Sequence, residues 1–108
     1  MSLRIVYVPA EKSNAKEIAE AVLREKLAAC CNIFPCESMY WWGGKVETAK
    51  ESALLIKTDE KRVQKLINRV KSIHKYDTPA IIVINPESVN NKYSKYMREV
   101  MGEQNGVV

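Results

Sequence analysis

The stretch YWWGGKVE at positions 40–47 decides how this chain folds. A Gly-Gly pair between two β-forming runs supplies the positive φ angles of a two-residue hairpin turn. The pair therefore predicts a hairpin in which Trp42 faces Lys45. Its arms, residues 30–42 and 45–58, are longer than a usual strand of about 5–6 residues. Arms of this length expose strand edges, which another subunit would cover most simply.

The residues before the hairpin predict one strand and one helix. The β-rich run at 3–8 should form a strand that ends at Pro9, because proline cannot donate a hydrogen bond to a ladder. Asn14 and Glu17 have the spacing of a capping box, and apolar residues follow them at helical intervals. A helix is therefore expected over about 15–28.

The residues after the hairpin predict a helix, a strand and another helix. Asp59 is a favourable N-cap, and apolar positions within 63–73 recur at helical spacing. The continuous apolar run at 80–84 is typical of a strand covered on both faces, or on one face and at an interface. A last helix is expected over 91–101. The order β-α-β-β-α-β-α is that of an α+β, ferredoxin-like (split βαβ) fold with an extended central hairpin and an added C-terminal helix.

Length and composition indicate a single soluble globular domain over residues 1–108. The chain has 108 residues, of which 46% are hydrophobic and 28% charged. The net charge of +4 is too small to indicate a nucleic-acid partner. The first residues hold too short an apolar run for a signal peptide, and no segment approaches the roughly 20 apolar residues of a membrane span. We therefore expect a cytoplasmic protein with no membrane or nucleic-acid partner.

One histidine and three cysteines are the candidates for metal or nucleophile chemistry. His74, in the segment HKYDTP at 74–79, either bonds a carbonyl at the end of the preceding helix or serves as a metal ligand or acid–base group. Cys30, Cys31 and Cys36 are more typical of reduced, buried small hydrophobes than of soft-metal ligands, since neighbouring strand residues face opposite sides. The chain contains no C-x-x-C, P-loop, G-x-G-x-x-G or G-x-S-x-G motif, so no catalytic residue is assigned.

The aromatic cluster at the turn is the remaining feature that needs a partner. Alternation along the strand puts Tyr40 and Trp42 on one face and Trp41 on the other. Large aromatic faces are costly to leave in water, so we expect Trp41 and Trp42 to lie in a subunit interface. A stacking platform for nucleic acid is the alternative. An RNA-binding domain of this fold carries paired aromatics on its central strands, and residues 3–8 offer only Tyr7.

Four segments together resemble the CutA divalent-cation tolerance family: LAACCNI at 27–33, YWWGGKVE at 40–47, IKT at 56–58 and HKYDTPAI at 74–81. The resemblance implies a ferredoxin-like subunit that forms a homotrimer through its long hairpin strands, similar in assembly to the PII signalling proteins. It also implies a link to copper or another divalent cation, with no cofactor required and no established catalytic reaction.

The resemblance carries one metal-ligating position over to this chain. His74 matches a family copper ligand, whereas Tyr7 and Ile73 stand where copper-linked bacterial members carry a cysteine and a second histidine. Candidates for a ligand cleft are Tyr40, Lys45, Glu47, Lys57 and Tyr76.

The function expected from these residues is that of a non-enzymatic homotrimer associated with the binding and tolerance of divalent metal ions, copper among them. Such a protein would act as a signalling or adaptor module similar to PII. The alternative is a small-molecule-binding enzyme whose site, built from Lys57, His74 and Tyr76, lies at a subunit boundary.

Overall fold

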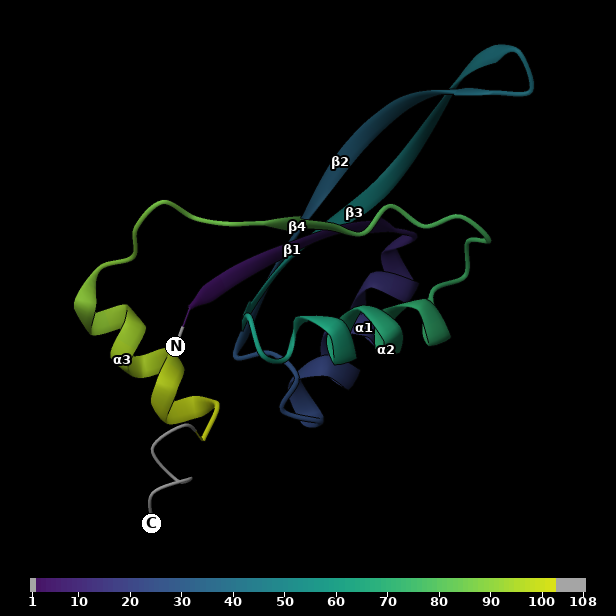
Figure 1. The fold of residues 1–108 in the computed structure, drawn as a ribbon. Helices are drawn as coiled ribbons and strands as arrows, with labels where there is room; N and C mark the ends of the chain where they lie inside the picture. Colours follow the sequence, from purple (N-terminus) through teal and green to yellow (C-terminus); the bar gives the residue numbers. More distant parts are fainter. Residues whose placement is uncertain (1, 103–108) are drawn as a thin grey trace.

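The computed structural model describes residues 2–102 and shows a four-stranded sheet with three helices (Figure 1). The elements follow one another as β1 (Leu3–Ala10), α1 (Lys12–Arg24), β2 (Cys30–Trp42), β3 (Lys45–Asp59), α2 (Val63–Ile73), β4 (Ile82–Ile84) and α3 (Asn91–Val100). All strand pairs are antiparallel and the strand order is β2-β3-β1-β4. The predicted α+β subunit fold is thereby confirmed. Residue 1 and residues 103–108, which the predicted domain includes, lie outside the described residues.

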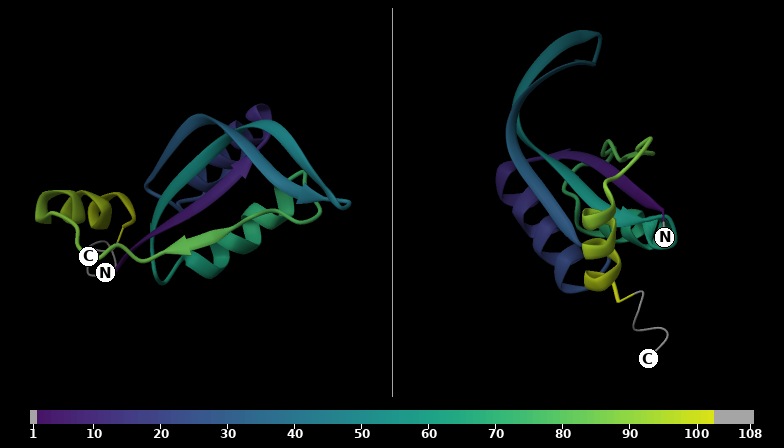
Figure 2. Two further views of the ribbon diagram at one scale, coloured as in Figure 1. Left: turned by 90° about the horizontal axis from the view of Figure 1, so that it is seen from above. Right: turned by 90° about the vertical axis from the view of Figure 1, so that its left-hand side faces the viewer.

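The helices α1 and α2 cover one face of the sheet (Figures 1 and 2). Along β1 and the part of β3 that pairs with it, residues 52–59, side chains alternate between two faces, and those that face these helices are largely buried. The core consists of strand residues Val6, Val8, Leu54 and Ile56 and helix residues Ile18, Val22, Leu66 and Val70. On the opposite face, α3 packs at one end through Met97 and Met101. The rest of that face has no helix above it, which leaves it open for other contacts.

The central hairpin extends well beyond the rest of the subunit and bends along its length (Figure 2). Its ladder runs without interruption from Cys30, opposite Lys57, to Trp42, opposite Lys45. Gly43 and Gly44 have φ angles of 58° and 79°, which confirms the predicted two-residue turn.

The first strand and helix begin and end at other residues than predicted. β1 continues through Pro9 to Ala10. Its pairing with β4 ends at Tyr7, so at Pro9 this edge of β1 has no partner strand. The missing N–H of proline therefore costs no hydrogen bond there. α1 begins at Lys12 with Glu11 as N-cap, so the prediction that Asn14 caps this helix is wrong. The helix ends at Arg24 and not near residue 28, since the backbone turns at Lys26, whose φ is 59°.

Asn14 is buried and joins the two helices. Its Nδ2 donates to the carbonyl of Ile73 at 3.0 Å, and its Oδ1 accepts from the N–H of Lys75 at 3.0 Å. Tertiary hydrogen bonds therefore use the amide that the local pattern assigned to a cap.

Two further predictions are corrected after the hairpin. Asp59 is the last residue of β3 and not the N-cap of α2, which is Arg62; the Asp59 Oδ1 accepts from the N–H of Arg62 at 3.0 Å. β4 is shorter than the predicted 80–84 and is an exposed edge strand, with Ile82 52% exposed, so it is not covered on both faces within the subunit. In residues 2–102 no helix has the length and apolar character to cross a membrane.

Candidate functional site

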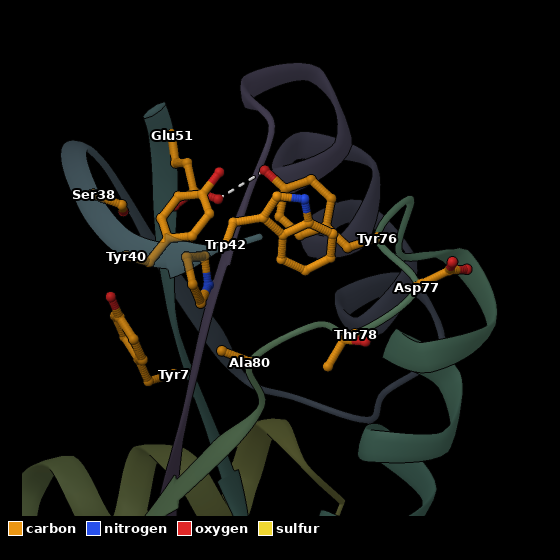
Figure 3. A pocket seen from close by; sticks show the side chains of 10 residues that line it. Tyr7, Ser38, Tyr40, Trp42, Glu51, Tyr76, Asp77, Thr78 and Ala80 are labelled. Atoms are coloured by element: carbon orange, nitrogen blue, oxygen red, sulfur yellow. Dashed lines mark hydrogen bonds between the residues drawn. The ribbon is translucent and has the colours of Figure 1, made fainter. Parts of the chain in front are cut away.

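A cavity of about 670 Å³ lies between the sheet and the segment that joins α2 to β4 (Figure 3). This volume is in the range of small-molecule pockets, about 300–1,000 Å³. Ten residues line this cavity, the aromatic pocket: Tyr7, Pro9, Ser38, Tyr40, Trp42, Glu51, Tyr76, Asp77, Thr78 and Ala80.

Strand register explains why these side chains meet. Ser38, Tyr40 and Trp42 alternate along β2 and therefore share one face. Glu51 pairs with Cys36 in the same ladder, so it belongs to that face as well. Tyr7 lies opposite Leu55 in β1 and, by the same alternation, faces the same side. The aromatic pocket therefore opens on the face of the sheet that α1 and α2 leave uncovered.

A phenol and a carboxylate meet inside the pocket. The Tyr76 hydroxyl donates a hydrogen bond to Oε2 of Glu51 at 2.7 Å (Figure 3). Burial, and next the hydrogen bond to Glu51, raise the pKa of Tyr76 above its usual value. The phenol consequently keeps its proton at neutral pH. The other oxygen of Glu51 accepts no hydrogen bond from the described residues.

His74 holds Tyr76 in place. Its Nδ1 accepts from the N–H of Tyr76 at 3.1 Å, and its Nε2 lies 3.0 Å from the carbonyl oxygen of Pro9. A carbonyl only accepts hydrogen bonds, so Nε2 must carry the proton and Nδ1 must be the acceptor. The His74 and Tyr76 rings also touch, with centroids 4.8 Å apart. His74 thus connects the end of α2 to β1 and positions one wall of the pocket.

This arrangement of His74 does not suit a metal ligand. The residue is only 9% exposed, and both ring nitrogens are engaged in hydrogen bonds. A metal ion needs a free nitrogen lone pair, and here the one lone pair already accepts the Tyr76 N–H. The sequence left two interpretations of His74 open: a hydrogen bond to a carbonyl, or a role as metal ligand or acid–base group. The geometry fits the carbonyl bond, although the carbonyl is that of Pro9 and not one at the end of the helix.

The described residues offer no other metal site within the subunit. In residues 2–102, no three His, Cys, Asp or Glu side chains come together in a way that could hold an ion. The three cysteines are free thiols, and Cys31 packs against the core. Burial, with a smaller effect of Cys30, raises the pKa of the Cys31 thiol to about 12, which disfavours the thiolate that a soft metal requires. The donor set of one subunit therefore does not fit the copper site that the family resemblance implies.

The structure places the predicted site residues in different parts of the subunit. Tyr40 and Tyr76 line the pocket together with Trp42, which the sequence assigned to a subunit interface. Trp41 is 75% exposed on the other face of the hairpin. Two predicted cleft residues, Lys45 and Glu47, are exposed near the hairpin turn and do not line the pocket.

Lys57 does not join His74 and Tyr76 within the subunit. It lies opposite Ile5, and its Nζ is 5.5 Å from the centroid of the Tyr93 ring on α3. Lys57 is therefore at the α3 end of the sheet, whereas His74 bonds Pro9 near the other end of β1.

Seven of the ten pocket residues were not among the predicted site residues, and three of these seven carry the pocket's remaining phenol and its two carboxylates: Tyr7, Glu51 and Asp77. Glu51 could have been found, because the Gly-Gly turn fixes the register and puts residue 51 on the face of Tyr40 and Trp42. Tyr7 could not have been placed in the pocket from the sequence, because the Gly-Gly turn fixes the pairing of β2 with β3 but not that of β1 with β3.

Comparison with known proteins adds sequence relatives. The model of the family "CutA1 divalent ion tolerance protein" matches residues 4–100. Protein CutA 1, chloroplastic, of Oryza sativa subsp. japonica is 43% identical over 96 residues, which cover 87% of this chain and 54% of the relative. The divalent-cation tolerance protein CutA of Pyrococcus horikoshii is 40% identical over 86 residues, covering 80% and 84%. The chain thus spans about half of the rice relative and most of the archaeal one.

Solved structures agree with the sequence relatives. CutA1 from Ehrlichia chaffeensis superposes with a TM-score of 0.88 at 33% identity, covering 93% of this chain and 95% of the other. CutA from Archaeoglobus fulgidus gives a TM-score of 0.88 at 36% identity, covering 92% and 98%. Because the family model spans nearly the whole described chain and these folds coincide, the chain belongs to the CutA1 divalent ion tolerance protein family.

Proposed function

We propose that this chain is a non-enzymatic, homotrimeric protein that binds a small ligand in the aromatic pocket and acts as a signalling or adaptor module. The observation that carries the proposal is the pocket itself, formed by strands, hairpin and the 76–80 segment on the open face of the sheet. Neither histidine nor cysteine is among its lining residues, and His74 next to it is used in positioning. A binding role therefore suits the pocket better than nucleophilic catalysis.

The exposed apolar strands support assembly of several copies. Phe34 on β2, and Ile82 and Ile84 on β4, are 40%, 52% and 42% exposed, and they lie on the two edge strands of the sheet. Exposed apolar patches and unpaired edges are features of protein–protein contact sites. Trp41, on the opposite face of the hairpin, is a further exposed apolar side chain that a partner subunit would cover. The number of three copies comes from the family resemblance, in which long hairpins hold a trimer together.

A role in divalent-cation tolerance is proposed to operate through ligand-dependent signalling. The printed names of the relatives refer to divalent-cation tolerance. Within one subunit, neither His74 nor the cysteines supply a fitting donor set among residues 2–102. The proposal therefore places the contribution of this chain in binding a small molecule and not in sequestering copper.

Two measurements test the proposed function. Light scattering should give the mass of a trimer at micromolar protein, and a folded monomer would contradict the assembly. Equilibrium dialysis against copper and zinc, with wild type and His74→Ala in parallel, should show no tightly bound ion that depends on His74. If wild type retained one copper or zinc ion per subunit and His74→Ala did not, His74 would be a metal ligand, and the proposal that this chain acts by binding a small molecule would be contradicted.

A further inference from the structure

The aromatic pocket has an unusual chemical composition for a protein with a net charge of +4. Two of its lining residues, Glu51 and Asp77, are acidic, and the ten include no lysine, arginine or histidine. Four others are aromatic: Tyr7, Tyr40, Trp42 and Tyr76. A basic protein therefore has a pocket whose walls are aromatic and whose charge is negative.

We infer that the aromatic pocket recognises an organic cation, namely an alkylated ammonium group carried by a small molecule. This inference rests on the proposed function, since it names the ligand class of the same pocket. The faces of tyrosine and tryptophan rings attract ammonium groups through their quadrupoles, and clusters of such rings with a nearby carboxylate favour methylated ammonium ions.

The position of Glu51 suits the charge of such a ligand. Tyr76 binds one carboxylate oxygen at 2.7 Å and fixes the group, while the other oxygen has no hydrogen-bond partner among the described residues. None of the ion pairs formed within residues 2–102 involves Glu51. Lys45 shares the face of Trp42 but does not line the pocket. The carboxylate is thus held in place without a cation of its own.

The rest of the pocket favours an organic cation over a metal ion. Magnesium and calcium take six or more oxygen ligands, and zinc and copper take about four nitrogen, sulfur or oxygen donors, whereas aromatic faces supply none of these. Figure 3 shows Glu51 beside Tyr40, with its hydrogen bond to Tyr76, and Asp77 at the opposite edge of the residues drawn, so the two carboxylates do not converge on one point. Pro9 and Ala80 add apolar wall, and about 670 Å³ has room for an uncharged portion besides the ammonium group.

The test compares two probes of equal shape with the intact, assembled protein. Choline carries a trimethylammonium group, and 3,3-dimethyl-1-butanol has a neutral carbon in place of the nitrogen. Isothermal titration should give at least tenfold tighter binding of choline. Glu51→Gln keeps an acceptor for the Tyr76 hydroxyl, and it should weaken choline at least fivefold while changing the neutral probe little. Glu37→Gln, an exposed carboxylate on the opposite face of the hairpin, is the matched control and should behave as wild type.

Each outcome separates this inference from the proposed function. Equal affinity for both probes, or equal effects of Glu51→Gln and Glu37→Gln, would overturn the organic-cation inference. Absence of choline binding by a protein that still binds a neutral dye, Nile red, through Trp42 would overturn the inference and leave the pocket as a binding site. Displacement of choline by stoichiometric zinc would assign the pocket to a metal ion and contradict it. Light scattering and circular dichroism verify that each variant is folded and assembled.

Discussion

Replacing His74 with alanine tests the structural role of the single histidine. The change removes the acceptor of the Tyr76 N–H and the donor to the Pro9 carbonyl at a site that is 9% exposed. A buried polar group left without a partner costs about 1–3 kcal/mol, so two such groups should cost about 2–4 kcal/mol after partial relaxation. A domain of about 100 residues loses about 4–8 °C of melting temperature per kcal/mol, which predicts a decrease of roughly 10–25 °C.

The assay is thermal and urea unfolding at one fixed protein concentration, because the stability of an assembled protein depends on concentration. Lys75→Ala is the neighbouring control. Its side chain is exposed and reaches Glu11 only at 3.7 Å, so its effect should stay within about 0.5 kcal/mol. His74→Ala should also weaken ligand binding, since Tyr76 loses its anchor. Wild-type stability in His74→Ala, together with loss of bound copper, would refute the structural role and favour a metal ligand.

Three further predictions concern the turn, a buried thiol and the assembly. Gly43 has a φ of 58°, and no atom lies within 4 Å of an added Cβ, so a side chain there strains only the backbone. Gly43→Val should lower the free energy of unfolding by about 1–2 kcal/mol, and Gly43→Asn clearly less, because asparagine tolerates a positive φ. Equal melting temperatures of the two variants would show another kind of turn. The pKa of Cys31 is raised from 9.0 to about 12 in the folded protein, so as the pH rises the thiol ionises in the unfolded chain before it does in the folded one, and the free energy of unfolding should fall between about pH 9 and pH 12. Urea unfolding at several pH values should show a smaller fall in Cys31→Ala, and an equal fall in wild type and variant would contradict the raised pKa of Cys31. Trp41→Ala should lower the mass measured by light scattering at micromolar protein while circular dichroism stays native, and an unchanged mass would remove Trp41 from the interface.

The hairpin could be predicted in detail because its information is local. The Gly-Gly pair fixes a two-residue turn, and a fixed turn sets every cross-strand pair behind it. The same register runs from Trp42, opposite Lys45, back to Cys30, opposite Lys57. The alternation of faces that follows from this register already brings Tyr40 and Trp42 together.

Helix ends and buried polar groups could not be predicted because their partners lie far away in sequence. Asn14 fits a local capping pattern, yet its amide bonds Ile73 and Lys75 across the helix pair. His74 likewise bonds Pro9, 65 residues earlier. A single-sequence pattern contains the capping preference but not the tertiary hydrogen bonds that compete with it.

Two of the five predicted cleft residues line the pocket, and the others do not for the same reason. Of the predicted cleft residues, Tyr40 and Tyr76 line the pocket, whereas Lys45 and Glu47 remain exposed near the turn. Charged side chains near a hairpin turn stay hydrated unless a partner covers them. Glu51 is different because the 76–80 segment partly covers it, and that segment is placed by tertiary contacts.

Titration with Nile red, a neutral fluorescent dye, tests most directly that the aromatic pocket is the binding site of this chain. Wild type should bind the dye saturably with one site per subunit. Trp42→Ala removes a pocket wall and should weaken binding at least tenfold, whereas Met39→Ala, which is equally exposed on the same strand but faces the other side, should bind as wild type does. Equal binding by the two variants, each verified as folded and assembled, would contradict the account.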